Sequence, residues 1–176
     1  MKDQKNANTF TLALFIIYLF SILYIIVFKF NMVFTHVKAE RQINFIPFVQ
    51  GIVAHKTLNY SEILLNILIF IPLGLYISVL KNQWRTWQKV LLFFGVSFLF
   101  ESLQYIFKIG AFDVTDLINN TLGGIIGLLI YLGINKAVNN NVKIQSLINI
   151  ISAAGTILIL AFLLFLKIEH LWLFRM

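Results

Sequence analysis

Five apolar runs divide the chain, and each is about as long as a helix that crosses a bilayer, which needs roughly 20 residues. Runs this long with few charges favour helices, because the strands of a membrane barrel would alternate apolar and polar residues. The chain of 176 residues is 60% hydrophobic and 12% charged, more apolar than soluble domains of its size. The sequence therefore predicts an all-α integral membrane protein, a bundle of about five transmembrane helices forming one domain over residues 1–176. The runs cover about residues 10–28, 61–80, 90–107, 117–134 and 147–166.

The gap between the first two runs, about residues 29–60, is longer than a simple loop. It contains the apolar piece INFIPFVQGIVA, which is too short to cross a bilayer. Such a piece is typical of an interfacial or re-entrant segment, and Pro47 predicts a bend at Ile46. The first run is long for a signal peptide and no cleavage motif follows it, so we expect a retained membrane anchor.

The cations of the chain lie in the gaps between the runs, and the formal net charge is +7. Membrane lipids with anionic headgroups are therefore the expected partners. The chain has no basic helix, zinc-ligand spacing or RNA-binding aromatic motif, which argues against nucleic acid as a partner. In a five-span arrangement seven Lys and Arg residues lie on each side of the membrane, with Lys89 assigned to the gap before the third run. Without the long first gap, seven lie on the side of the N-terminus and three on the other side, which predicts a cytoplasmic N-terminus.

Polar residues near the ends of three runs converge on one side of the membrane in any five-span arrangement. Their spacings of three and four residues place them on one face of each predicted helix. Arg41 and Asn44 of the long gap belong to the same side, which the charge count predicts to be the outer one. The stripes hold Glu62 and Asn66 from the second run, Ser97, Glu101, Gln104 and Lys108 from the third, and Asp113, Asp116, Asn120, Gly123 and Gly127 from the fourth.

The acids of this group each need a stabilising partner. Glu101 is expected about 9 Å from the end of its helix, and a carboxylate at a bilayer centre costs roughly 3 kcal/mol. We expect Arg41 or Lys108 to pair with Glu101. Asp113 or Asp116 can cap the fourth helix, where the carboxylate accepts backbone N–H groups at the positive helix end.

Small residues in two runs predict how the helices pack. Gly123 and Gly127 form a GxxxG motif, which lets two membrane helices approach closely. Pro72 and Gly74 predict a bend in the second helix.

Four short motifs resemble those of the VanZ-like family of small bacterial membrane proteins. They occur in the family's order within residues 41–130, so the chain reads as a single VanZ-like membrane domain. The resemblance implies a role in the bacterial cell envelope and in resistance to teicoplanin-type glycopeptides. The motifs are R-x-x-N-x-x-P-F from Arg41, N-x-x-x-F-I-P-x-G from Asn66, S-x-x-x-E-x-x-Q from Ser97 and F-D-x-x-D-x-x-x-N-T-x-G-G from Phe112.

The preferred hypothesis is an outer-face polar pocket that binds a lipid headgroup, a lipid-linked cell-wall precursor or a lipoglycopeptide. Two alternatives stay open: an intramembrane enzyme that holds Mg²⁺ through Glu101, Asp113 and Asp116 to act on a lipid-linked phosphate, and a non-catalytic structural partner of envelope enzymes. No catalytic residue or cofactor is assigned, and the three histidines lack metal-ligand spacing. The candidate binding residues are Arg41, Asn44, Asn66, Glu101, Gln104, Asp113, Asp116 and Asn120.

Overall fold

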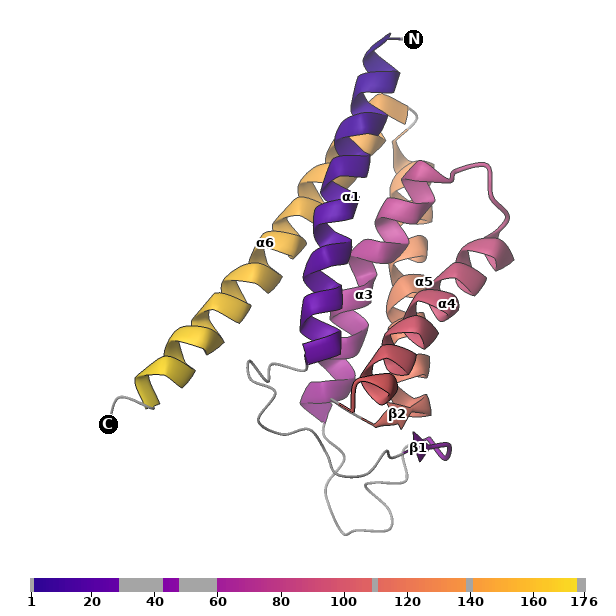
Figure 1. Ribbon diagram of the computed structural model, residues 1–176. Coiled ribbons are helices and arrows are strands. Elements are labelled where there is room, and N and C mark those ends of the chain that lie inside the picture. Colours follow the sequence, from indigo (N-terminus) through magenta and orange to yellow (C-terminus); the bar gives the residue numbers. More distant parts are fainter. Residues whose placement is uncertain (1, 29–42, 48–59, 109–110, 139–140, 174–176) are drawn as a thin grey trace.

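The computed structural model describes residues 2–28, 43–47, 60–108, 111–138 and 141–173, and within these ranges the chain forms five helices (Figure 1). The all-α prediction is therefore confirmed, and each apolar run lies in its own helix. The helices are α1 (Lys2–Phe28), α3 (Tyr60–Leu80), α4 (Thr86–Ile106), α5 (Val114–Ala137) and α6 (Asn141–Leu173).

Three of these helices are long and apolar enough to cross a membrane. They contain the segments Glu62–Leu80, Thr86–Ile106 and Val114–Ala137, and they match the second, third and fourth predicted spans. The described apolar parts of α1 and α6, Asn8–Leu23 and Lys143–Leu158, are shorter. The chain is therefore a membrane protein in which α3, α4 and α5 are long enough to span a bilayer.

Two short strands were not expected from the sequence. β1 (Ile43–Asn44) and β2 (Phe112–Asp113) pair in parallel, with Asn44 opposite Asp113. The pairing lies at the end of the bundle where α4 ends and α3 and α5 begin (Figure 1). It ties part of the long first gap to the start of α5, whereas the predicted interfacial or re-entrant path of that gap lies mostly outside the described residues.

Glycines bring α3 and α5 into close contact, as the GxxxG motif predicts. A methyl group added to Gly123 or Gly127 would overlap the backbone carbonyl oxygen of Ile67 or Ile71 in α3. Gly74 faces α5 in return, since a methyl group there would overlap a backbone oxygen of α5 and come within 2.8 Å of another backbone atom. Gly74 thus serves the close approach of two backbones, whereas the bend that the sequence suggested at Pro72 and Gly74 stays a prediction.

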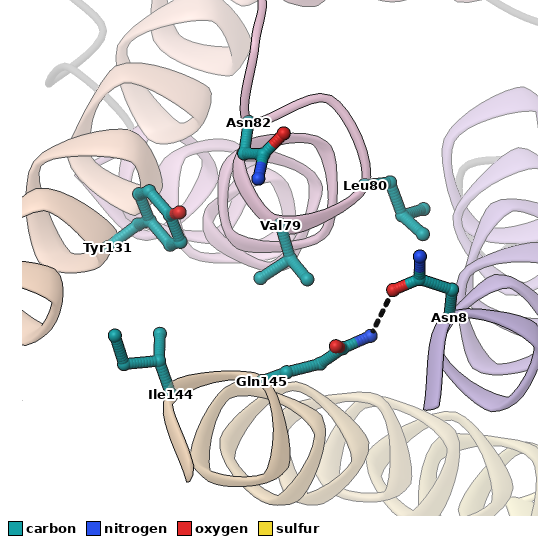
Figure 2. Close-up of a pocket in the computed structure, with 7 residues that line it drawn as sticks. All are labelled: Asn8, Val79, Leu80, Asn82, Tyr131, Ile144 and Gln145. Atoms are coloured by element: carbon teal, nitrogen blue, oxygen red, sulfur yellow. Dashed lines mark hydrogen bonds between the residues drawn. The ribbon is translucent and has the colours of Figure 1, made fainter. Parts of the chain in front are cut away.

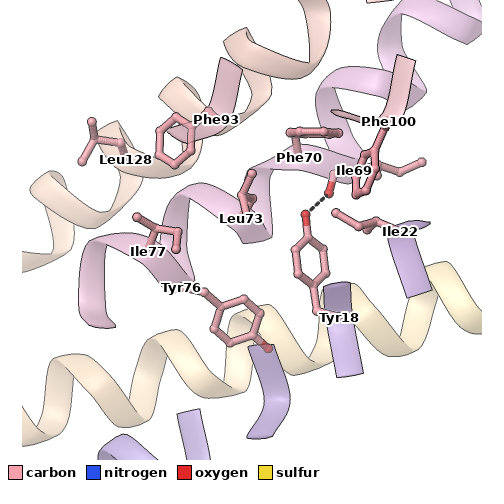
Figure 3. Close-up of a cluster of buried hydrophobic side chains, with 10 residues drawn as sticks. All are labelled: Tyr18, Ile22, Ile69, Phe70, Leu73, Tyr76, Ile77, Phe93, Phe100 and Leu128. Atoms are coloured by element: carbon pink, nitrogen blue, oxygen red, sulfur yellow. Dashed lines mark hydrogen bonds between the residues drawn. The ribbon is translucent and has the colours of Figure 1, made fainter. Parts of the chain in front are cut away.

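Aromatic side chains attach α1 to this pair of helices. The Tyr18 ring of α1 lies beside Tyr76 of α3, with 5.7 Å between the ring centroids. Its hydroxyl donates a hydrogen bond of 2.7 Å to the backbone oxygen of Ile69, one turn before Pro72 (Figure 3). Phe70 of α3 meets Phe100 of α4 edge to face. Burial of these rings stabilises the bundle whose end carries the polar residues.

Candidate functional site

The polar residues predicted from the sequence meet at the end of the bundle that carries β1 and β2. They come from the start of α3, the end of α4 and the start of α5, which the alternating helix directions place at the same membrane face. We call this group the polar cluster. Its described members are Asn44, Asn66, Ser97, Glu101, Gln104, Asp113, Asp116, Asn119 and Asn120.

Asp113 joins three parts of the cluster. Its carboxylate accepts a 2.7 Å hydrogen bond from the backbone N–H of Thr115, so it is the N-cap of α5. The second carboxylate oxygen accepts a bond of 3.2 Å from the side-chain amide of Asn44. The Asp113 backbone N–H donates to Glu101 at 3.1 Å. The capping role expected for an acid at this position is confirmed, and the β1–β2 pairing explains how Asn44 reaches it.

Asp116 forms the second carboxylate–amide pair of the cluster. Its Oδ1 accepts a hydrogen bond of 2.7 Å from Nδ2 of Asn66 in α3, and the side chain is 7% exposed. Asp116 lies in the first turn of α5, where the positive end of the helix favours a carboxylate. The pair connects α3 and α5 directly above their glycine contact, so the predicted stripe combines packing and polar residues on one helix face.

Deeper in the bundle the cluster contains uncharged groups. Asn120 of α5 donates a 3.0 Å hydrogen bond to the hydroxyl of Ser97 in α4, and both side chains are buried. Within the described part of the chain, Oδ1 of Asn120 and Nδ2 of Asn119 are buried without a hydrogen-bond partner. One acceptor and one donor are therefore available to water or to a polar ligand.

Glu101 and Gln104 are both fully buried on the inner face of α4. The sequence predicted an ion pair between Glu101 and either Arg41 or Lys108. Arg41 lies outside the described residues, so that part stays a prediction. Glu101 accepts a hydrogen bond from the backbone N–H of Asp113, a donor whose position is set by the capped start of α5.

The cluster consists of carboxylates, which accept hydrogen bonds, surrounded by side-chain amides. Three carboxylates lie near the start of α5, and the described amides of Asn44 and Asn66 each bind one of them. Such a set favours ligands that present N–H, O–H or ammonium groups. In the described ranges no three or more His, Asp or Glu side chains are grouped so that they could hold a metal ion together.

The structure thus brings together seven of the eight predicted binding residues, Arg41 being outside the described ranges. Two further members were not among the predicted binding residues. Asn119 follows the stripe residue Asp116 by three positions, so helical spacing alone could have identified it. Ser97 was in a motif, yet its contact with Asn120 depends on how α4 packs against α5.

A pocket of about 80 Å³ lies at the opposite end of the bundle (Figure 2). It is bordered by the start of α1, the ends of α3 and α5, and the start of α6. Lys89, which the sequence placed in a gap, instead lies in the first turn of α4, buried, with its ammonium 5.6 Å from the Tyr131 ring centroid. That assignment was wrong because α4 begins earlier than the apolar run. The residues that line the pocket are Asn8, Val79, Leu80, Asn82, Tyr131, Ile144 and Gln145.

Comparison with known proteins gives two matches and one negative result. Residues 15–138 match the VanZ/LLP1 family, from within α1 to the end of α5. Protein VanZ from Enterococcus faecium is 31% identical over 156 residues, which cover 88% of this chain and 92% of that protein. No solved structure matches the chain.

Proposed function

Because the chain belongs to the VanZ/LLP1 family, we propose that it contributes to resistance against teicoplanin-type glycopeptides in the bacterial cell membrane, and that it acts through the polar cluster. The cluster would bind the headgroup of a lipid, a lipid-linked cell-wall precursor or the lipoglycopeptide itself. Resistance would follow from altered access of the drug to its target.

The convergence of carboxylates and amides at one membrane face carries this proposal. Acids in membrane helices are costly, and they normally mark sites that bind or move polar groups. Here Glu101 and Asp116 are buried, and each accepts a hydrogen bond that fixes its position. Buried Asn119 and Asn120 supply a further donor and acceptor. The cluster therefore has the rigid, acceptor-rich character that an ammonium or peptide-bearing headgroup requires.

The orientation is part of the proposal. The polar cluster would face the outside, where glycopeptides act, and the N-terminus would be cytoplasmic. If Lys89 is left out because it is buried in α4, six cations still flank the apolar runs on the N-terminal side, against three on the other side without the first gap. The excess on the N-terminal side supports a cytoplasmic N-terminus.

Ligand binding can be tested with purified protein in lipid nanodiscs. Three probes are added separately: teicoplanin, a lipid-linked cell-wall precursor and phosphatidylethanolamine. The probe that binds should raise the thermal unfolding midpoint, because a ligand that binds only the folded state stabilises it. If none of the three changes the midpoint, the binding proposal fails.

A charge-relocating variant provides the matched control. The double variant Asn66→Asp with Asp116→Asn keeps an amide–carboxylate hydrogen bond between α3 and α5 but moves the carboxylate to the other helix. It should fold and lose the ligand response. Retention of the full response would show that the pair only joins the two helices.

A further inference from the structure

A second set of polar side chains lies between α6, α1 and α3, away from the polar cluster. Four residues of α6, spaced four, three and four apart, share one face of the helix and are each at least 93% buried. This face lies beyond residues 15–138, the range that matches the family. The four residues are Gln145, Asn149, Ser152 and Thr156, and we call them the α6 seam.

Polar residues of α1 and α3 line the other side of the seam. Nε2 of Gln145 donates to the side-chain oxygens of Asn8 and Thr11 in α1, each at 2.8 Å. Further along, the buried hydroxyl of Tyr76 in α3 faces Thr156. None of these side chains carries a formal charge at neutral pH. The seam is therefore suited to uncharged polar molecules.

The seam begins at the pocket shown in Figure 2. Asn8 and Gln145 belong to both, and their hydrogen bond lies at the edge of the pocket. Asn82, which is exposed, forms part of the opposite wall. A volume of about 80 Å³ with several amide groups around it can hold ordered water, which needs polar partners and at least roughly 10–15 Å³ for each molecule.

Two atoms of α6 further inside have no protein partner. Oδ1 of Asn149 and Oγ of Ser152 are buried and have no hydrogen-bond partner within the described ranges. An unsatisfied polar atom of this kind costs about 1–3 kcal/mol. Buried polar groups are normally satisfied by protein or by ordered water. Both atoms follow Gln145 on the same helix face, so water from the pocket would reach Asn149 first and Ser152 next.

We propose that the α6 seam holds a column of water molecules. The column begins at the pocket, at the end of the bundle where α1 and α6 begin, and extends to Ser152. Ser152 follows Gln145 by seven positions, which corresponds to about 10 Å along the helix axis. The column gives water and small uncharged solutes access to the middle of the bundle from the face opposite the polar cluster. Ions are disfavoured because the lining has no compensating charge.

Cysteine accessibility tests the column, and the chain has no native cysteine to interfere. Ser152→Cys and Asn149→Cys are compared with Ala154→Cys, a small residue on the exposed face of the same helix near the same depth. The probe is methyl methanethiosulfonate, a small uncharged reagent that the seam would admit and that reacts with the thiolate. Asn82→Cys reports that the reagent reaches the pocket.

With position 154 facing the lipid, its thiol is desolvated, and each unit by which desolvation raises a thiol pKa removes about nine-tenths of the reactive thiolate. Positions 149 and 152, which face the proposed water, should therefore react at least about tenfold faster than position 154. Equal, slow reaction at all three positions, with position 82 labelled, would overturn the proposal.

The unsubstituted protein provides an independent measurement. Water-edited solid-state NMR in lipid should transfer magnetisation from water to Asn149 and Ser152 faster than to Ile148, a buried apolar neighbour on α6. Equal transfer to all three would exclude the column, including in the case that a cysteine variant does not fold.

Discussion

The side-chain amide of Asn66 lies 2.7 Å from a carboxylate oxygen of Asp116, and this hydrogen bond joins α3 to α5 at the rim of the polar cluster. The two residues are 50 positions apart in sequence. A bond to a charged group is stronger than one between neutral groups, and the burial of Asp116 limits competition from water. The same contact fixes the helices and positions a carboxylate.

A double-mutant cycle should measure this contact. Asn66→Ala, Asp116→Ala and the double variant are expected to show a coupling of about 1.5–3 kcal/mol in unfolding free energy, the range for hydrogen bonds to charged groups. Denaturation of the purified protein in mixed detergent–lipid micelles gives the values. Asn135→Ala, an exposed residue in the last turn of α5, is the control and should change stability little. Strict additivity of the two substitutions would contradict the contact.

The α3–α5 interface predicts opposite effects for glycines in the same chain. Gly127→Ala and Gly74→Ala should each destabilise by about 1–3 kcal/mol or more, because the new methyl group meets backbone atoms that cannot move aside. Gly133→Ala and Gly95→Ala meet nothing within 4 Å and should gain up to about 1 kcal/mol from better helix propensity. Thermal unfolding midpoints of the four variants check this. Similar losses at all four positions would show that the close approach is absent.

The sequence predicted the helical architecture and the convergence of the polar residues because both follow from local patterns. Run length identified the helices, and spacings of three and four placed Glu101, Asp116 and Asn120 on inward faces. The alternating direction of the helices then brought those faces to one end of the bundle without any knowledge of packing.

Contacts between distant segments could not be predicted in this way. The pairing of Asn44 with Asp113 depends on the path of the first gap, which no periodicity describes. The buried position of Lys89 depends on where α4 begins, several residues before its apolar run. The α6 seam was missed because three of its four residues lie in a run that was judged by hydropathy alone.

The end of α4 contains a residue in a conformation that glycine prefers. Lys108 follows the C-cap Phe107 and has φ of 56°, in the left-handed region. Lys108→Gly should therefore stabilise the protein by about 0.5–1 kcal/mol, since glycine adopts this conformation without a steric penalty. Lys108→Ala removes the charge and keeps the steric penalty, so it should give no gain. A larger gain for alanine than for glycine would contradict this explanation.

Membrane orientation can be measured with single cysteines in the cysteine-free chain. With a cytoplasmic N-terminus, Arg85→Cys should be labelled only after the cells are opened. Asp113→Cys and the exposed Glu62→Cys should react with an impermeant reagent from outside. Glu62→Cys serves as a check because Asp113 caps α5 and its loss affects folding. The reverse pattern would place the polar cluster on the cytoplasmic face.

Teicoplanin susceptibility of cells that express cluster variants tests the proposed function most directly. Glu101→Gln and Asp116→Asn keep an oxygen that can accept the hydrogen bonds from Asp113 and Asn66 and remove the charge. Both variants should accumulate in the membrane like the parent protein and lose resistance, whereas the exposed control Glu62→Gln should retain it. Full resistance in both variants at normal abundance would contradict a role for the cluster.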